Sequence, residues 1–96
     1  MPGQKIVYAH TTASMTTATA AVLALNTARE YALIVNDGSA TVYIKVGAAA
    51  VANEGIRINA NGGSYEMSRA LGNLSTVAIN GITATGAAVL LVTEGI

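Results

Sequence analysis

The clearest pattern in the chain is a strict alternation of apolar and polar residues between positions 40 and 46. A period of two residues is typical of a β-strand with one buried face and one exposed face. The alternation therefore predicts a half-buried strand here. The side chains expected toward the core are Ala40, Val42, Ile44 and Val46, and those expected on the opposite face are Thr41, Tyr43 and Lys45.

The preceding segment, residues 31–35, is apolar on both faces, which favours a central strand over an edge strand. An Asp37-Gly38 pair lies between this segment and residues 40–46. Such a pair between two strand-like runs is typical of a tight hairpin, because glycine adopts positive φ without steric cost. We therefore predict that the two segments pair with each other as a β-hairpin.

Short strand-like segments separated by turn residues continue to the C-terminus. Residues 47–55 form a predicted loop, Asn61-Gly62-Gly63 is a turn signal, and residues 69–73 form a connection. Tyr65 and Met67 are expected to face the same side of their strand. The predicted strands cover residues 56–60, 64–68, 76–80 and 87–93, the last two being separated by Gly81 and Gly86.

The N-terminal quarter of the chain has a weaker pattern. We predict a short strand over residues 5–9, followed by a connection rich in threonine and serine as far as Thr17. Alanine and leucine in residues 18–25 permit a helix, but the neighbouring threonines favour a strand that ends near Leu25 before a turn at Asn26-Thr27. Residues 1–17 are expected to form an N-terminal arm or an edge strand.

Seven to eight short strands, with turn residues every 8–12 positions, predict an all-β fold. We expect one domain over residues 1–96, built as an antiparallel β-sandwich or a small β-barrel. The single proline, Pro2, leaves every predicted strand free to donate its ladder hydrogen bonds.

The composition is unusually poor in charge. Five basic and five acidic residues make 10% of the chain, against about 25% in an ordinary soluble domain. The balance offers neither a basic surface for nucleic acid nor one for a membrane. Because so few charges protect the surface from association, we expect copies of the chain or a larger partner to cover much of it. A neutral monomer coated with threonine, asparagine and serine is the alternative.

Two further features bear on compartment and redox chemistry. The chain has no cysteine, which excludes a disulfide framework, a thiolate metal site and a thiol nucleophile. Its apolar runs, such as residues 21–25, are far shorter than a membrane span or the apolar core of a signal peptide. We expect a soluble protein made in the cytoplasm.

The residues with catalytic potential are scattered. His10 is the single histidine, and no nucleophile stands near it in a recognisable arrangement. A metal site needs several converging ligands, so neither a metal nor a cofactor is expected. The carboxylates that could in principle form an acid–base pair are Asp37, Glu54, Glu66 and Glu94, and they are expected in turns or on solvated or interface surfaces.

Other motifs also have simpler structural explanations. Gly62-Gly63 precedes a predicted strand, whereas a phosphate-binding loop needs a helix behind it. Asn73-Leu74-Ser75 matches the N-glycosylation pattern, although a match of three residues arises often by chance. The four tyrosines are the aromatic residues of the chain, and Tyr43 on its polar strand face could stack on a sugar or anchor a subunit contact.

The chain from Arg29 onward resembles a class of small structural proteins of tailed bacteriophages, namely capsid decoration (cement) proteins and head-fibre modules. The segments that carry the likeness are residues 31–36, 38–39, 42–44 and 47, then 55–58, 63–66, 77–79 and 91–95. The resemblance implies a β-sandwich-like module on the capsid exterior or on a fibre, often assembled as a homotrimer, and it implies no catalytic residues.

These observations lead to three hypotheses. The first is a non-enzymatic decoration protein of the virion, which binds the major capsid protein of the assembled head and stabilises it. The second is a head- or tail-fibre module that binds a host surface glycan through Tyr43 or Tyr65 beside Asn and Arg side chains. A small hydrolase-like enzyme ranks last, because no nucleophile and base can be named.

Overall fold

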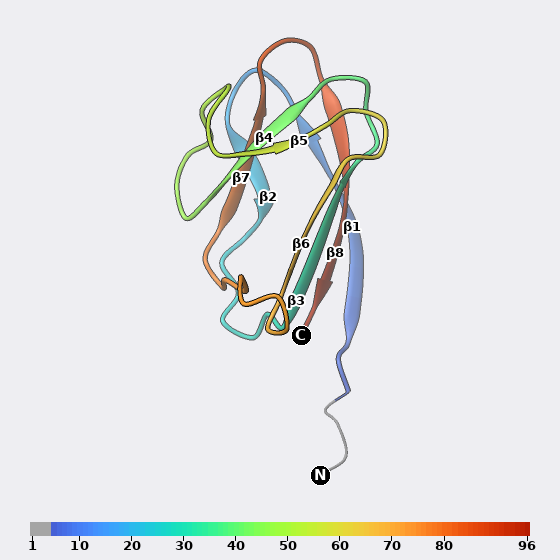
Figure 1. Cartoon of the computed structure of the whole chain (residues 1–96), viewed down its shortest axis with the longest axis vertical. Helices are drawn as coiled ribbons and strands as arrows, with labels where there is room; N and C mark the ends of the chain where they lie inside the picture. The colour runs from blue at the N-terminus through green and yellow to red at the C-terminus, as the bar shows by residue number, and fades with distance from the viewer. Residues whose placement is uncertain (1–4) are drawn as a thin grey trace.

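The computed structural model describes residues 5–96, which form eight β-strands and no helix (Figure 1). The strands are β1 (Tyr8–Met15), β2 (Ala20–Leu23), β3 (Tyr31–Asn36), β4 (Val42–Val46), β5 (Ile56–Ile58), β6 (Ser64–Ser68), β7 (Ile79–Thr83) and β8 (Ala88–Gly95). They make two antiparallel sheets of four strands each. The predicted all-β sandwich is therefore confirmed.

The strand order identifies the topology. Sheet A has the order β1-β8-β3-β6, and sheet B has the order β2-β7-β4-β5. The first strand thus pairs with the last, the second with the seventh, the third with the sixth and the fourth with the fifth, and successive pairs alternate between the sheets. A long antiparallel hairpin rolled into two layers gives this order, which is the jelly roll.

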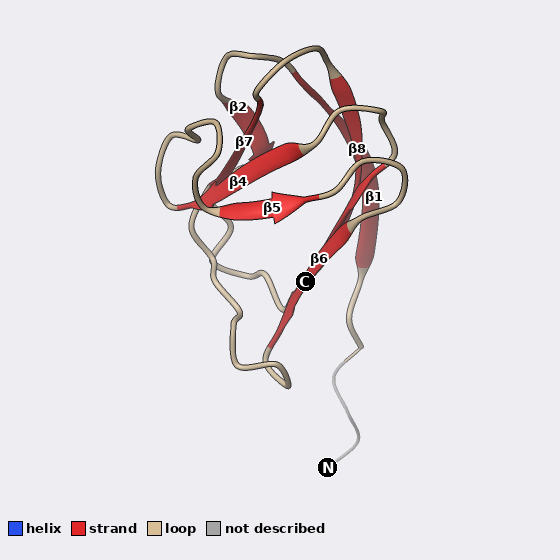
Figure 2. Cartoon of the chain, turned by 45° about the horizontal axis from the view of Figure 1, so that its top comes forward, coloured by secondary structure: helices blue, strands red, loops and turns tan. Residues whose placement is uncertain are grey.

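The core lies between the inner faces of the two sheets. Alternation sends every second side chain inward, and the β-branched residues of the central strands fill this space. Sheet A also extends beyond sheet B, because β1 and β8 have eight residues each while the strands of sheet B have three to five (Figure 2). The most deeply buried apolar side chains are Met15, Ile34, Val42, Ile44, Ile58, Met67, Ile79 and Leu90.

The hairpin predicted at Asp37-Gly38 is wrong. β3 pairs with β6 and β8, whereas β4 pairs with β5 and β7, so residues 37–41 cross from one sheet to the other. Gly38 does not have a positive φ; a Cβ there would lie 2.7 Å from the Cβ of Ala88. The glycine is needed for a close approach of two backbones.

The buried side chain of Asn36 explains the crossover. Its Nδ2 donates to the carbonyl oxygens of Ala40 (2.8 Å) and Ile58 (3.1 Å), and its Oδ1 accepts from the N–H of Gly38 (3.0 Å). These bonds satisfy backbone groups that a hairpin ladder would otherwise pair. They also fix the path from sheet A into sheet B.

The N-terminal prediction is correct in part. The first strand is Tyr8–Met15 instead of residues 5–9, so the expected connection before Thr17 is largely a strand, and residues 1–4 lie outside the described part of the chain. β1 is an edge strand of sheet A. Residues 18–25 contain β2, which confirms a strand over a helix, and the Arg29 N–H donates to the carbonyl of Asn26 (3.1 Å) in the predicted turn region.

β7 is displaced from its predicted position, whereas β8 (Ala88–Gly95) overlaps most of the strand predicted over residues 87–93. β7 covers Ile79–Thr83 and contains Gly81 within it, where a boundary was predicted. A Cβ at Gly81 would lie 2.6 Å from the sulfur of Met15 and 3.0 Å from a methyl of Val22. This glycine therefore makes room for core side chains of β1 and β2.

Candidate functional site

His10 lies on the outer face of sheet A, beside β8. Its Nδ1 is 3.0 Å from the hydroxyl oxygen of Thr93, the residue directly opposite it in the β1–β8 register. Across residues 5–96, no group of three or more His, Asp or Glu side chains is placed to hold a metal ion. The structure thus assigns His10 to a cross-strand contact on an exposed face.

The glutamates expected in turns or on surfaces each have a different partner. Glu54 pairs with Lys45 (Oε1 to Nζ, 2.9 Å) at the surface, and Glu66 accepts a hydrogen bond from the Tyr31 hydroxyl (2.6 Å) on the outer face of sheet A. Glu94 is bound to Arg29 in the interior. These contacts bring no two of the three glutamates together, and each of the three has a structural partner. Asp37 is exposed in the connection from β3 to β4.

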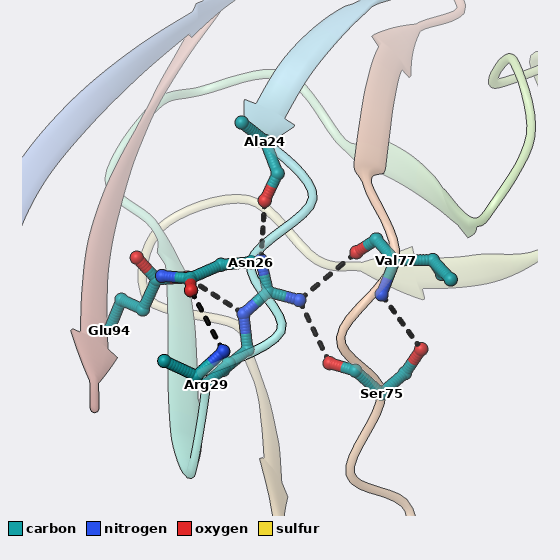
Figure 3. A network of polar contacts seen from close by, with 7 residues as sticks. Ala24, Asn26, Arg29, Ser75, Val77 and Glu94 are labelled. Carbon is teal, nitrogen blue, oxygen red and sulfur yellow. Dashed lines mark hydrogen bonds and ion pairs between the residues drawn. The ribbon is translucent and has the colours of Figure 1, made fainter.

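Arg29 is completely buried and forms the most extensive polar network among the described residues (Figure 3). Its Nε donates to Glu94 Oε2 (2.8 Å) near the end of β8. Its Nη1 donates to the carbonyls of Ser75 (2.8 Å) and Val77 (3.0 Å), and its Nη2 donates to the carbonyl of Ala24 (2.7 Å). One guanidinium therefore joins the loop after β2, the loop before β7 and strand β8.

This network has a structural role. All three guanidinium nitrogens of Arg29 donate to internal oxygens, and the side chain has no exposed surface on which a ligand could bind. The side chain closes the end of the sandwich where sheet A extends beyond sheet B. No local pattern in the sequence indicates this role, since arginine is almost never fully buried unless paired.

Asn73 of the possible glycosylation motif is also engaged in the fold. Its Oδ1 accepts from the N–H of Ser68 (3.0 Å), and its Nδ2 donates to the carbonyl of Glu66 (2.9 Å) and to the hydroxyl of Tyr65 (3.2 Å). The amide thus covers the open edge of β6. Glycosylation of Asn73 would require these contacts to break.

The outer face of sheet A carries few charged side chains; we call it the sheet A face. At its centre lie Leu33 and Val35 of β3 with Val89 and Leu91 of β8; Val89 and Leu91 are each 42% exposed. Among the outward-facing residues of the four strands, Glu66 is the one carboxylate, and it lies on the edge strand β6. Protein interfaces likewise have few charges at their centre.

A hollow of about 550 Å³ lies on this face and is lined by residues of β1, β8 and β3. Threonine hydroxyls and the single histidine surround apolar side chains in it, which suits a partner with a small apolar group and a few hydrogen-bonding groups. Its lining residues are His10, Thr11, Thr12, Val35, Leu91, Val92 and Thr93.

Two tyrosines form the end of the sheet A face nearest the C-terminus. The rings of Tyr8 and Tyr31 meet edge to face, with centroids 5.9 Å apart and an interplanar angle of 86°. They flank Gly95, which stands opposite both residues in the register. The hydrogen bond to Glu66 raises the pKa of Tyr31, because that bond and the nearby carboxylate favour the neutral phenol.

A second, smaller candidate surface lies on the outer face of sheet B. Tyr43 stands opposite Arg57 of β5, whose Nε donates to Asn59 Oδ1 (2.9 Å). Tyr43 also lines a hollow of about 470 Å³ together with Ser39, Ala40, Thr41, Ala84 and Thr85. An aromatic ring beside hydroxyls is a combination that could stack on a sugar. Tyr65 does not join this site, since it packs against the core from the inner face of sheet A.

Comparison of the chain with models of protein families, with curated proteins and with solved structures found no match. Residues 5–96 contain no helix long and apolar enough to cross a membrane. Of the two surfaces, the sheet A face was missed at the level of sequence, although a signal was present. Apolar residues on both faces of residues 31–35 predict a central strand, and the order β1-β8-β3-β6 confirms it. The outward side chains of that strand are nevertheless half-exposed, which is the signal of the sheet A face.

Proposed function

We propose that this chain is a non-enzymatic structural protein of a tailed-bacteriophage virion, and that it binds the assembled head as a decoration protein. The observation that carries the proposal is the sheet A face, which is apolar at its centre and nearly free of charge. Exposed apolar patches of this kind on soluble proteins mark interaction sites. The low charge of the whole chain and the resemblance of residues 29–95 to phage modules support the same assignment.

The mechanism would be selective binding to the closed shell. A protein that binds the assembled head and not its dissociated subunits shifts the equilibrium toward assembly, as any ligand stabilises the state that it prefers. The sheet A face would supply the contact, with Val89 and Leu91 at its centre. Jelly-roll sandwiches occur in viral capsids and in lectins alike, so the fold is compatible with this role by analogy alone.

The size of the face sets the strength of one contact. Four strands about 4.8 Å apart and up to eight residues long cover roughly 20 by 25 Å, or about 500 Å² in projection. Stable protein interfaces bury about 800 Å² on each partner. One copy would therefore bind weakly, and self-association would raise the affinity by presenting several faces at once.

A sedimentation assay with purified heads tests the proposal. The wild-type protein should cosediment with mature heads, and the double substitution Val89→Lys/Leu91→Lys should reduce binding at least tenfold. Ala21→Lys, on the exposed outer face of sheet B, is the matched control and should bind normally. Normal binding by the double variant, or loss of binding in the control alone, would contradict the proposal.

The Tyr43 hollow supports a second candidate function, a fibre module that binds a host glycan. Here Tyr43 would stack on a sugar ring, while Ser39, Thr41 and Thr85 would supply hydroxyls for hydrogen bonding. A glycan array would then show binding that Tyr43→Ala abolishes and that Val89→Lys/Leu91→Lys leaves unchanged. An array without any bound glycan would remove this candidate.

A further inference from the structure

The two sheets have four edge strands, and three of them are protected against pairing with another strand. β2 has four residues and a register shift between Ala21 and Leu23, and β5 has three residues and carries Arg57. The edge of β6 is capped by Asn73, whose side chain bonds the N–H of Ser68 and the carbonyl of Glu66. Short length, irregularity, charge and cover are the devices by which proteins block open edges.

Within residues 5–96, none of these devices is found at β1. It has eight residues, its register with β8 is unbroken from Tyr8 to Met15, and it contains no lysine, arginine, carboxylate, proline or glycine. Besides Tyr8, its polar side chains are one histidine, two threonines and one serine. The strand is exposed up to the buried Met15, apart from a half-buried Ala13. A long, regular and uncharged edge is a template for another strand.

The hydrogen-bond pattern identifies which backbone groups of β1 are open. Val7 and Ile96 exchange both backbone hydrogen bonds (2.8 and 2.9 Å), so this is a hydrogen-bonded pair. Such pairs alternate with non-hydrogen-bonded pairs along an antiparallel ladder. The backbone groups of the odd-numbered residues of β1 therefore bond to β8. The backbone N–H and C=O groups of the even-numbered residues point to the open edge; these residues are Tyr8, His10, Thr12 and Ser14.

We propose that β1 pairs antiparallel with β1 of a second copy of this chain, about a two-fold axis. One register uses all the open groups: Tyr8 faces Ser14 of the other copy, His10 faces Thr12, and Thr11 faces Thr11 at the axis. No charged side chains meet in this register, and Thr–Thr pairs across strands are favourable. The two sheets A become one sheet of eight strands.

Charge and area both favour a second copy as the occupant. The chain has no formal net charge and β1 contains no lysine, arginine or carboxylate, so two copies approach without repulsion between such groups. Joining two copies along β1 places two sheet A faces side by side and brings the projected area to about 1,000 Å². The choice of a second copy rests here on the proposed function: the doubled face exceeds the roughly 800 Å² that a stable interface buries on each partner, so a pair would bind the head where one copy binds weakly. A closed pair replaces the homotrimer that the resemblance implies, because an isologous contact closes with two copies.

Sedimentation equilibrium and a proline substitution test the pair. The wild-type chain should have about twice its monomer mass of 9.6 kDa, while Thr12→Pro should be monomeric with an unchanged far-UV circular dichroism spectrum. The Thr12 N–H points away from β8, so proline removes no bond within one copy. Thr12→Val keeps that N–H and is the matched control, which should remain dimeric.

Cross-linking gives an independent measurement if Thr12→Pro fails to fold. Because the chain has no cysteine, a single introduced thiol reports on one position. Under mild oxidation Thr11→Cys should form a disulfide-linked dimer at least tenfold faster than Ser14→Cys, although both sites are exposed. A monomeric or trimeric wild-type mass, a dimer that survives in a folded Thr12→Pro variant, or equal cross-linking at the two sites would overturn the proposal.

Discussion

Replacing Arg29 by methionine tests the energetics of the closed end of the sandwich. Methionine fills a similar volume but removes every donor, so Glu94 and the carbonyls of Ser75, Val77 and Ala24 lose their partner at once. An unsatisfied buried acceptor costs about 1–3 kcal/mol, and breaking a buried ion pair from one side costs about 3–5 kcal/mol.

The expected loss is about 4 kcal/mol. This is below the simple sum of the separate costs, because contacts of one side chain are not additive and water can reach part of Glu94, whose side chain is 20% exposed. A domain of this length has a free energy of unfolding of about 5–14 kcal/mol, so the variant should be close to the limit of stability. Urea unfolding followed by circular dichroism measures the change.

Arg57→Met is the matched control for this prediction. Arg57 is exposed on β5 and bonds to the Asn59 side chain, and its loss should change the free energy of unfolding by no more than about 0.5 kcal/mol. Adding Glu94→Gln to Arg29→Met should restore about 1 kcal/mol, since the uncompensated charge is then gone. A loss below about 1 kcal/mol for Arg29→Met would refute the role assigned to the network.

Three further predictions follow from individual contacts. Gly38→Ala should lower the free energy of unfolding by about 1–3 kcal/mol, because the added Cβ clashes with Ala88. In a double-mutant cycle, Ala88→Gly should restore part of the lost stability. If the cost came from the backbone φ of residue 38 instead, Ala88→Gly would restore none of it. The raised pKa of Tyr31 means that its neutral form stabilises the fold, so this contribution is complete below the ordinary tyrosine pKa near 10 and is lost as pH rises through the higher native value. Glu66→Gln should lower the pKa of Tyr31, followed by ultraviolet absorbance, toward the ordinary tyrosine value, and an unchanged titration of Tyr31 would contradict the assignment. Asn73→Ala should lower the free energy of unfolding by about 1–2 kcal/mol and speed amide exchange on β6, and normal exchange there would show that its amide does not cap that edge.

Local features of the fold were predictable from sequence, because alternation depends on neighbouring residues. Val42 and Ile44 are buried as predicted, while Tyr43 and Lys45 on the opposite face are partly exposed. The prediction is wrong at the two ends, because Val46 is 37% exposed and Ala40 lies before β4 begins. The position of β6 over Ser64–Ser68 also agrees with the prediction. In both strands one face meets the core, so the period of two residues is visible in the sequence.

Partner choice was not predictable, because it depends on residues far apart in the chain. Asn36 directs β4 into the other sheet through bonds to Ala40 and Ile58. β1 was largely missed, because an edge strand beyond the cover of sheet B shows small polar residues on both faces. The burial of Arg29 likewise needs three separate segments to meet, which no local pattern reports.

A density map of the intact virion would test the proposed function most directly. We expect eight-stranded sandwiches on the exterior of the head, arranged as pairs joined along β1, with Val89 and Leu91 of each copy against the shell. Sandwiches in the tail, or on the head with the outer face of sheet B against the shell, would contradict the proposal.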